Sequence, residues 1–241
     1  MCGRYSNVKK AIPNEHRYAV RYAGISPEPT YNAAPSQLLP VMPTFSNTVE
    51  YFSWGLVPAW ANDLKTNKPI NARAESLATS AMFRSLLSSK RCLVPADGFY
   101  EWQVQTITQT DLFGNPTTNK RKEKKQPYRI ALKNDELFSF AGLWDEWVDK
   151  NTGEVLKTFT IITTAANELM RPIHDRMPVI LTPEAEELWL DEHETNKSLL
   201  LDLLKPYDAQ AMKAYPISEL VNSPANNSAE LLNSLKFNIL N

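Results

Sequence analysis

The sequence is poor in the residue types that usually form metal sites and disulfide frameworks. Its 241 residues include only two cysteines, Cys2 and Cys92, and three histidines, His16, His174 and His193. Two cysteines are too few for the cross-links that stabilise a small secreted domain, and the histidines show no metal-ligand spacing. We therefore expect no disulfide framework, no metal site and no cofactor.

Long apolar runs and a strong net charge are also missing. No run is long enough to cross a bilayer, and the N-terminus lacks a basic region followed by an apolar stretch, so we expect a cytoplasmic protein. The formal net charge of −1 argues against coating nucleic acid through bulk charge but is compatible with a local basic cleft. Hydrophobic residues at 43% and charged residues at 22% are typical of a soluble globular chain. We expect one domain over residues 1–241 and a monomer.

The first four residues, Met1-Cys2-Gly3-Arg4, hold the most distinctive chemistry of the chain. If Met1 is removed, Cys2 carries a primary amine and a thiol, and both can add to one aldehyde carbon to close a five-membered thiazolidine ring. The ordinary pKa of an α-amine lies closer to neutrality than that of a lysine, so part of the amine is already nucleophilic. The plainer alternative is a start residue followed by an incidental cysteine.

The pattern of apolar, aromatic and turn residues predicts many strands and a few helices. The expected strands are residues 38–45 and 49–57 as one hairpin, 91–96 and 99–103 as a second hairpin across Asp97-Gly98, and then 128–132, 137–144, 158–164 and 179–181. The expected helices cover residues 12–22, 77–87, 167–173, 183–190 and 197–204. We expect a loop or hairpin insertion at 103–127 and a loop at 222–228.

Asn71 and Arg73 are expected just ahead of the helix that begins at residue 77. Backbone donors and positive potential gather at a helix N-terminus, so this is a reasonable place for an anion such as phosphate. Asn71 as a simple capping or turn residue is the competing interpretation.

Glu101 lies in an expected strand between Tyr100 and Trp102. Alternation along the strand places Glu101 on the same face as Phe99 and Gln103. If that face is interior, the carboxyl group is desolvated and its pKa rises, as a general acid or base near neutrality requires. If the face is exposed, Glu101 is an ordinary surface residue.

Two further positions have both a functional and a structural interpretation. His174, flanked by Ile173 and Asp175-Arg176 at an element boundary, is either a tuned proton donor or a surface histidine with charged neighbours. Trp54 and Trp60, on either side of Pro58, either pack in the core or form a platform on which a nucleic-acid base stacks.

Separated segments of the chain resemble one family, the SOS-response-associated peptidase (SRAP) domain proteins. Their order and spacing match over nearly the whole chain, with a core at residues 2–222. Each motif alone is weak, but together in register they are specific. The segments are Met1-Cys2-Gly3-Arg4-Tyr5, Tyr31-Asn32-Ala33-Ala34-Pro35, Ile70-Asn71-Ala72-Arg73-Ala74-Glu75, Pro95-Ala96-Asp97-Gly98-Phe99-Tyr100-Glu101-Trp102 and Ile173-His174-Asp175-Arg176-Met177-Pro178.

The resemblance implies a single α+β domain in which a curled, mixed but largely antiparallel sheet forms a pseudo-barrel with peripheral helices. It also implies a protein of the DNA damage response that captures abasic sites in single-stranded DNA as covalent DNA–protein crosslinks, associated with the nucleoid if the source is bacterial. In the implied reaction Cys2 forms a Schiff base and then a thiazolidine, and Asn71 orients the Cys2 end. Glu101 moves protons, and His174 is the acid that opens the sugar ring.

The family is also similar in releasing its own Met1, which implies a thiol-dependent autopeptidase in addition to lyase-like activity. The resemblance further implies that Arg4, Arg73, Arg84 and Arg176 contact phosphates and that Trp54 is a stacking surface. The chain departs from the family pattern in the length of the insertion at 103–126, in Ala81 where some relatives carry a basic residue, and in the tail after Val221.

Two other functions fit part of the sequence. An N-terminal-nucleophile amidohydrolase of the glutamine-using kind also begins Met-Cys-Gly, and it would release ammonia from glutamine without DNA. A non-catalytic single-strand binder would use the arginine and tryptophan positions and would form no covalent product.

Overall fold

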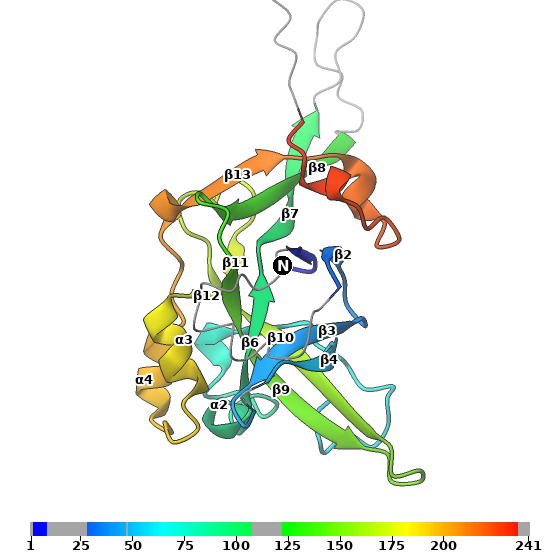
Figure 1. Ribbon diagram of the computed structural model, residues 1–241, viewed down its shortest axis with the longest axis vertical. Helices are drawn as coiled ribbons and strands as arrows, with labels where there is room; N and C mark the ends of the chain where they lie inside the picture. The colour runs from blue at the N-terminus through cyan, green and yellow to red at the C-terminus, as the bar shows by residue number, and fades with distance from the viewer. Residues whose placement is uncertain (1, 9–27, 47, 108–121, 236–241) are drawn as a thin grey trace, which may run out of the picture.

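Strands dominate the computed structural model, which describes residues 2–8, 28–46, 48–107 and 122–235 (Figure 1). The helix expected at residues 12–22 and the tip of the insertion lie outside these residues. Among the described residues the strands form two sheets, in which most neighbours are antiparallel. The expected α+β fold class is therefore confirmed.

The larger sheet closes on itself. Its strand order is β11-β10-β4-β3-β6-β9-β12, and β9 also pairs with β10, so β10, β4, β3, β6 and β9 enclose a barrel. Of the strands in the described part of the chain, only β4 and β5 run parallel to their neighbour β10. The bounds are β3 Leu38–Pro43, β4 Glu50–Trp54, β5 Asn71–Arg73, β6 Arg91–Ala96, β9 Phe138–Val148, β10 Val155–Ala165, β11 Arg176–Pro178 and β12 Ile180–Leu181.

The smaller sheet carries the N-terminal strand between its neighbours. The order is β13-β8-β7-β1-β2, and Figure 1 shows β1 in blue between β7 and β2. The long antiparallel pair β7 and β8 forms the base of the expected hairpin insertion. The bounds are β1 Tyr5–Asn7, β2 Thr30–Ala33, β7 Gly98–Ile107, β8 Lys122–Leu132 and β13 Met212–Pro216.

Helices cover one side of the barrel. Trp189 and Leu200, from α3 (Pro183–Leu190) and α4 (Lys197–Asp202), pack in one cluster with Met42 and Leu93 of the barrel strands. Thr182 caps α3 as expected, because its hydroxyl oxygen accepts a hydrogen bond from the Ala185 N–H at 3.3 Å. No helix in the described part of the chain is long and apolar enough to span a membrane. The remaining helical elements are η1 Ala74–Ser76, α2 Leu86–Ser89, η2 Ala209–Ala211, η3 Glu219–Asn222 and η4 Ala229–Leu232.

The helix expected at residues 77–87 is wrong. Successive turns fill most of that stretch, and only α2 at its end is helical. The hydroxyls of Ser76 and Thr79 donate to the backbone oxygens of Arg73 and Ser76, and such local bonds compete with a continuous helix. Asn71 and Arg73 therefore lie on strand β5 rather than ahead of a long helix. The helix expected at 167–173 is likewise a set of turns.

The hairpin expected across Asp97-Gly98 is also wrong, although both of its strands exist. β6 pairs with β3 and β9 in the barrel, whereas β7 pairs with β1 and β8 in the smaller sheet. Asp97 is the residue where the chain passes from one sheet to the other, and its side chain is 1% exposed. In contrast, the hairpin expected at 38–57 is confirmed by the antiparallel pair β3 and β4.

Candidate functional site

Strand β1 places Cys2 beside Glu101. Tyr5 pairs with Phe99, and the Tyr100 N–H donates to the Arg4 oxygen at 3.0 Å. Because the strands are antiparallel, each step back along β1 corresponds to one step forward along β7, which brings the Cys2-Gly3 end alongside Glu101. Cys2 itself is 1% exposed.

The charge of Glu101 acts directly on the thiol. Burial raises the pKa of Cys2 well above its ordinary value, and the nearby Glu101 carboxylate raises this pKa further. A hydrogen bond with the Arg4 backbone opposes this rise more weakly, and the thiol donates to the Arg4 backbone oxygen at 3.9 Å. The thiol is therefore a protonated, buried group rather than a free thiolate.

Glu101 lies on the interior face of β7, as its interpretation as a desolvated acid or base required. It is 2% exposed, and Phe99 on the same face packs in the cluster that contains Cys2, whereas Tyr100 and Trp102 pack in a different cluster. Burial raises the pKa of Glu101, and a protonated His174 would oppose that rise. Glu101 thus has the desolvated carboxyl group that proton transfer near neutrality needs.

His174 reaches the same region from the turns after β10. Its Nδ1 atom accepts a hydrogen bond from the Arg176 backbone N–H at 3.0 Å and lies 2.9 Å from an oxygen of Asp175. The backbone N–H always donates, while the Asp175 side chain is 85% exposed, so we assign Nδ1 as an acceptor and the ring proton to Nε2. In this tautomer the imidazole is a proton donor through Nε2.

Glu101 and His174 line a common pocket of about 460 Å³. The other described lining residues are Trp102, Val104 and Lys125. The pocket combines a carboxyl group, an imidazole and an ammonium group. Trp102 and Lys125 are not among the predicted site residues. Trp102 follows Glu101 in sequence, and Lys125 ends the basic run Lys120-Arg121-Lys122-Glu123-Lys124-Lys125, for which the sequence favours a solvated loop or hairpin and allows contact with a phosphate backbone.

Asn71 contributes a buried polar atom on strand β5. Its side-chain nitrogen lies 3.5 Å from the Ile161 backbone oxygen, and its Oδ1 atom has no hydrogen-bond partner among the described residues. Ile161 belongs to the core cluster that includes Cys2. A buried acceptor of this kind is ready to receive an N–H donor.

The predicted phosphate-binding arginines fall into two groups. Arg73 and Arg84 are exposed. Arg4 is bound internally, because its guanidinium donates to Asn32 Oδ1 at 2.8 Å and to the Val221 oxygen at 2.6 Å.

Arg176 is also bound internally. It donates to both carboxylate oxygens of Glu75, at 2.6 and 2.9 Å. These hydrogen bonds lower the pKa of Glu75, and the charge of Arg73 lowers it further, so both arginines act on one carboxylate. Arg84 is not among the described residues that line the pocket.

Trp54 contradicts its predicted role as a stacking surface. Its indole is 1% exposed, lies between Tyr5 and Phe159, and donates to the Ile70 oxygen at 2.9 Å. No face of the ring is available to a base, so Trp54 is a core residue. Trp60, in the loop that follows β4, is 63% exposed.

Comparison with known proteins gives one consistent result. The model of the family "SOS response associated peptidase (SRAP)" matches residues 1–224. The abasic site processing protein YoqW of Bacillus subtilis is 50% identical, over 97% of this chain and all of the relative. The abasic site processing protein HMCES of Xenopus tropicalis is 32% identical, over 85% of this chain and 66% of the relative. A solved structure of a Bacteroides thetaiotaomicron protein superposes with a TM-score of 0.79 at 33% identity, covering 98% of this chain and all of that one.

Proposed function

This chain belongs to the SOS response associated peptidase (SRAP) family, and from that premise we propose that it processes abasic sites in single-stranded DNA. In this proposal Met1 is removed autocatalytically, and Cys2 then forms a thiazolidine crosslink with the aldehyde of the ring-opened deoxyribose. The observation that carries the proposal is the coupling of three groups: the buried Glu101 carboxyl acts on the Cys2 thiol and shares a pocket with His174.

Removal of Met1 is the first step. The Cys2 sulfur attacks the Met1 carbonyl carbon, so the methionyl group moves from the Cys2 nitrogen to the Cys2 sulfur as a thioester. Water then hydrolyses the thioester, so that overall one water is consumed, methionine is released and Cys2 has a free amine and a free thiol. The departing amine needs a proton, and a carboxyl group whose pKa is raised by burial can supply one. Glu101 is the buried acid nearest to that bond by the register of β1 and β7.

Formation of the Schiff base is the second step. The His174 Nε2–H gives its proton to the ring oxygen as the C1′–O4′ bond of the abasic sugar breaks. The C1′ hydroxyl gives its proton to solvent, and solvent returns one to His174, so the ring opens to the aldehyde without a net gain or loss of protons. The Cys2 amine attacks the aldehyde carbon, and Glu101 first accepts a proton from the amine and then donates one to the leaving hydroxyl group. The amide oxygen of Asn71 accepts from the amine and orients it. One water leaves.

Ring closure is the third step. Because burial and Glu101 keep the thiol protonated, the amine is the first nucleophile and the sulfur the second. The sulfur adds to the imine carbon, its proton ends on the nitrogen, and the five-membered ring is complete. The whole crosslinking reaction releases one water and needs no metal, oxidant or cofactor as co-reactant.

DNA binding uses local charge on a nearly neutral protein. We assign phosphate contacts to the exposed Arg73 and Arg84. We also assign them to Arg4 and Arg176, whose guanidinium groups would bind a phosphate either in addition to their present hydrogen-bond partners in the protein or in place of them. A few point charges of this kind suit a single strand and give salt-dependent affinity. We expect the protein to act as a cytoplasmic monomer.

The test is direct. Purified protein is mixed with a single-stranded oligonucleotide that contains one abasic site, and products are separated after heating. We expect a heat-stable adduct whose mass is the sum of the two components less one water. A tetrahydrofuran analogue, which has no aldehyde, and the Cys2→Ala variant should give no adduct. Tight binding without a covalent product would show a non-catalytic binder instead.

A further inference from the structure

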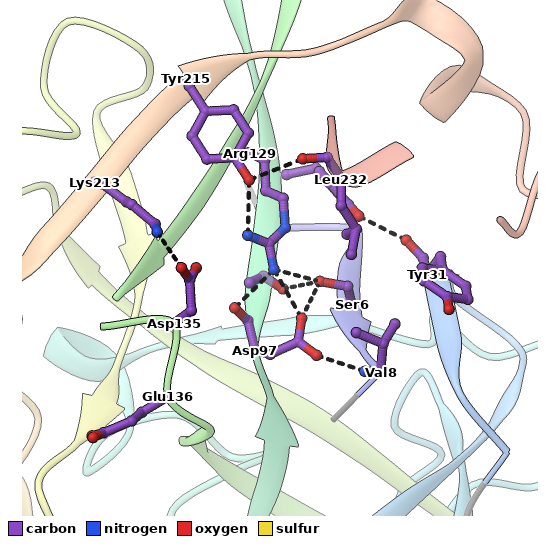
Figure 2. Close-up of polar contacts among 12 residues, drawn as sticks. Ser6, Val8, Tyr31, Asp97, Arg129, Asp135, Glu136, Lys213, Tyr215 and Leu232 are labelled. Carbon is purple, nitrogen blue, oxygen red and sulfur yellow. Dashed lines mark hydrogen bonds and ion pairs between the residues drawn. The ribbon is translucent and has the colours of Figure 1, made fainter. Parts of the chain in front are cut away.

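A buried ion pair lies at the passage between the two sheets, where the turn was expected. The Asp97 and Arg129 side chains are 1% and 6% exposed, and Asp97 Oδ1 accepts from Arg129 Nη2 at 3.0 Å (Figure 2). None of the three proposed chemical steps uses either residue.

Asp97 attaches strand β1 to this ion pair. Its Oδ1 atom accepts from the Ser6 hydroxyl at 2.6 Å, and its Oδ2 atom accepts from the Val8 backbone N–H at 2.6 Å (Figure 2). The Asp97 backbone N–H also donates to the Ser6 oxygen at 2.9 Å. Both carboxylate oxygens are therefore directed at the segment that leads to Cys2.

Arg129 binds the same carboxylate oxygen as Ser6, and its Nη2 atom lies 3.5 Å from the Ser6 hydroxyl oxygen. Its guanidinium also donates to the Asp97 backbone oxygen at 3.0 Å and to the Tyr215 hydroxyl at 3.0 Å, and Tyr215 donates onward to the Leu232 oxygen (Figure 2). Burial alone would lower the pKa of Arg129, but Tyr215 and Asp97 outweigh it and the pKa is raised. The guanidinium stays charged.

Gly98 makes room for this arrangement. A Cβ atom at Gly98 would lie 2.7 Å from both Cζ and Nη2 of Arg129, closer than side-chain atoms approach. The φ angle of Gly98 is not positive, so the glycine is required by the close approach of Arg129 and not by a turn.

Strand β1 has few backbone pairs that define its register, so side-chain contacts such as those of Tyr5 with Trp54 and of Asp97 with Ser6 matter more. It is three residues long, and only Tyr5 and Ser6 are paired with β7, while its pairing with β2 is irregular between Tyr5 and Asn7. A slip by one residue would move the strand by about 3.3 Å and turn each side chain to the other face. Buried ion pairs add little net stability compared with apolar packing, but they can specify one arrangement.

We propose that Asp97 and Arg129 are positioning residues that fix the register of β1 and thereby hold Cys2 beside Glu101. This inference rests on the proposed function for its catalytic readout. Asp97 and Arg129 touch neither DNA nor the reacting atoms; they act through Ser6 and Val8. A misplacement of about 1 Å in a reacting group lowers the rate by roughly a hundredfold, so the register of a short strand matters for the rate.

The experiment compares Asp97→Asn, Ser6→Ala and the double variant Asp97→Asn/Arg129→Met, in which neither charge remains buried. The control is Lys90→Met, which breaks the Lys90–Asp145 ion pair (2.7 Å) away from β1. Three quantities are measured well below the unfolding temperature: the adduct-forming rate at saturating abasic-site DNA, the Kd for the tetrahydrofuran oligonucleotide, and hydrogen exchange of the Tyr100 amide, which donates to Arg4.

We expect the two Asp97 variants to lose roughly tenfold to a hundredfold in rate with little change in Kd, and to exchange the Tyr100 amide faster. Ser6→Ala, which keeps the ion pair, should lose less. The Lys90→Met control should lose stability but not rate. If the double variant regained both the wild-type stability and the wild-type rate, the proposal would be overturned. The ion pair would then contribute only to the stability of the fold.

Failure of the proposed function gives a different pattern. If the wild-type protein forms no adduct, the exchange of the Tyr100 amide still decides whether the ion pair fixes β1. Unchanged exchange in folded Asp97→Asn would refute the positioning role, whatever the chemistry of Cys2.

Discussion

The carboxylate charge of Glu101 adds to burial in raising the pKa of the Cys2 thiol, so the two side chains form one coupled acid–base pair. Cys2 lies just before β1 and Glu101 lies on β7, and these two strands are about a hundred residues apart in sequence and adjacent in the sheet. It follows that a change at Glu101 should alter both the proton transfers at the amine and the state of the sulfur.

Glu101→Gln should abolish most of the proton transfer while keeping the shape of the site. General acid–base catalysis contributes roughly a hundredfold to ten-thousandfold, so we expect a loss of that order in the adduct-forming rate with an unchanged Kd for the tetrahydrofuran oligonucleotide. Single-turnover kinetics measure the loss. The matched control is Glu123→Gln, an exposed acid on the same β7–β8 hairpin. Equal losses in the two variants would remove Glu101 from the mechanism.

The same substitution should stabilise the fold at neutral pH. The folded-state pKa of Glu101 is raised above its ordinary value of 4.5, so the folded protein binds the proton more tightly than the unfolded chain does. Stability therefore falls as pH rises from the unfolded to the folded pKa, and the full penalty is present above the latter. Glu101→Gln lacks this penalty. Urea unfolding should show the variant as the more stable protein at pH 7, with a difference that shrinks towards pH 4. A constant difference would contradict the assignment.

Sequence patterns predicted individual strands better than their partners. Alternation correctly placed Glu101 on the same face as Phe99, which packs in the core cluster that contains Cys2, and Tyr100 on the other face. This succeeded because the direction of a side chain in a strand is a local property. The prediction of a hairpin across Asp97-Gly98 was wrong, although this dipeptide is typical of turns. In this protein Asp97 binds the Arg129 guanidinium, and Gly98 leaves the space that the guanidinium occupies; Arg129 lies 32 residues further on in the sequence. No local pattern contains that contact.

For the candidate site as well, the sequence predicted individual residues better than their packing. Cys2, Glu101 and His174 were found from motifs, and the structure brings the last two into one pocket. Trp54, at the end of β4, and Trp60, in the loop after it, are close in sequence, so only the tertiary packing separates the buried indole from the exposed one.

Trp54 and Trp60 should therefore give opposite results when truncated. Trp54→Ala removes a buried indole and should lower the free energy of unfolding by about 3–5 kcal/mol. Trp60→Ala should leave stability nearly unchanged and, if its exposed face stacks on a base, weaken binding to the tetrahydrofuran oligonucleotide by about 1–3 kcal/mol. Denaturation and fluorescence anisotropy measure the two effects. Unchanged binding in Trp60→Ala would show that DNA does not reach this loop.

Arg73 and Arg84 should contribute to affinity through charge. Each phosphate contact to single-stranded DNA contributes about 0.7 to the slope of log K against log salt, so Arg73→Gln and Arg84→Gln should each reduce the slope by about that amount. The exposed Lys205, which follows α4, provides a control in Lys205→Gln. Binding titrations over a range of salt concentrations give the slopes. A slope identical to that of the control would exclude the tested arginine from the phosphate path.

Removal of Met1 should depend on the thiol of Cys2. In cells this is hard to see, since an aminopeptidase removes Met1 from chains with a small second residue, including Cys2→Ala. In a purified translation system without that aminopeptidase, the wild-type protein should lose Met1 and Cys2→Ala should retain it, because only the wild-type chain has the nucleophile. Glu101→Gln should lose Met1 more slowly if the raised pKa of Glu101 supplies the proton to the departing amine. Intact-mass spectrometry reads all three. A wild-type chain that keeps Met1 under these conditions would show that the removal is not autocatalytic, and the free amine would then have to come from the cell.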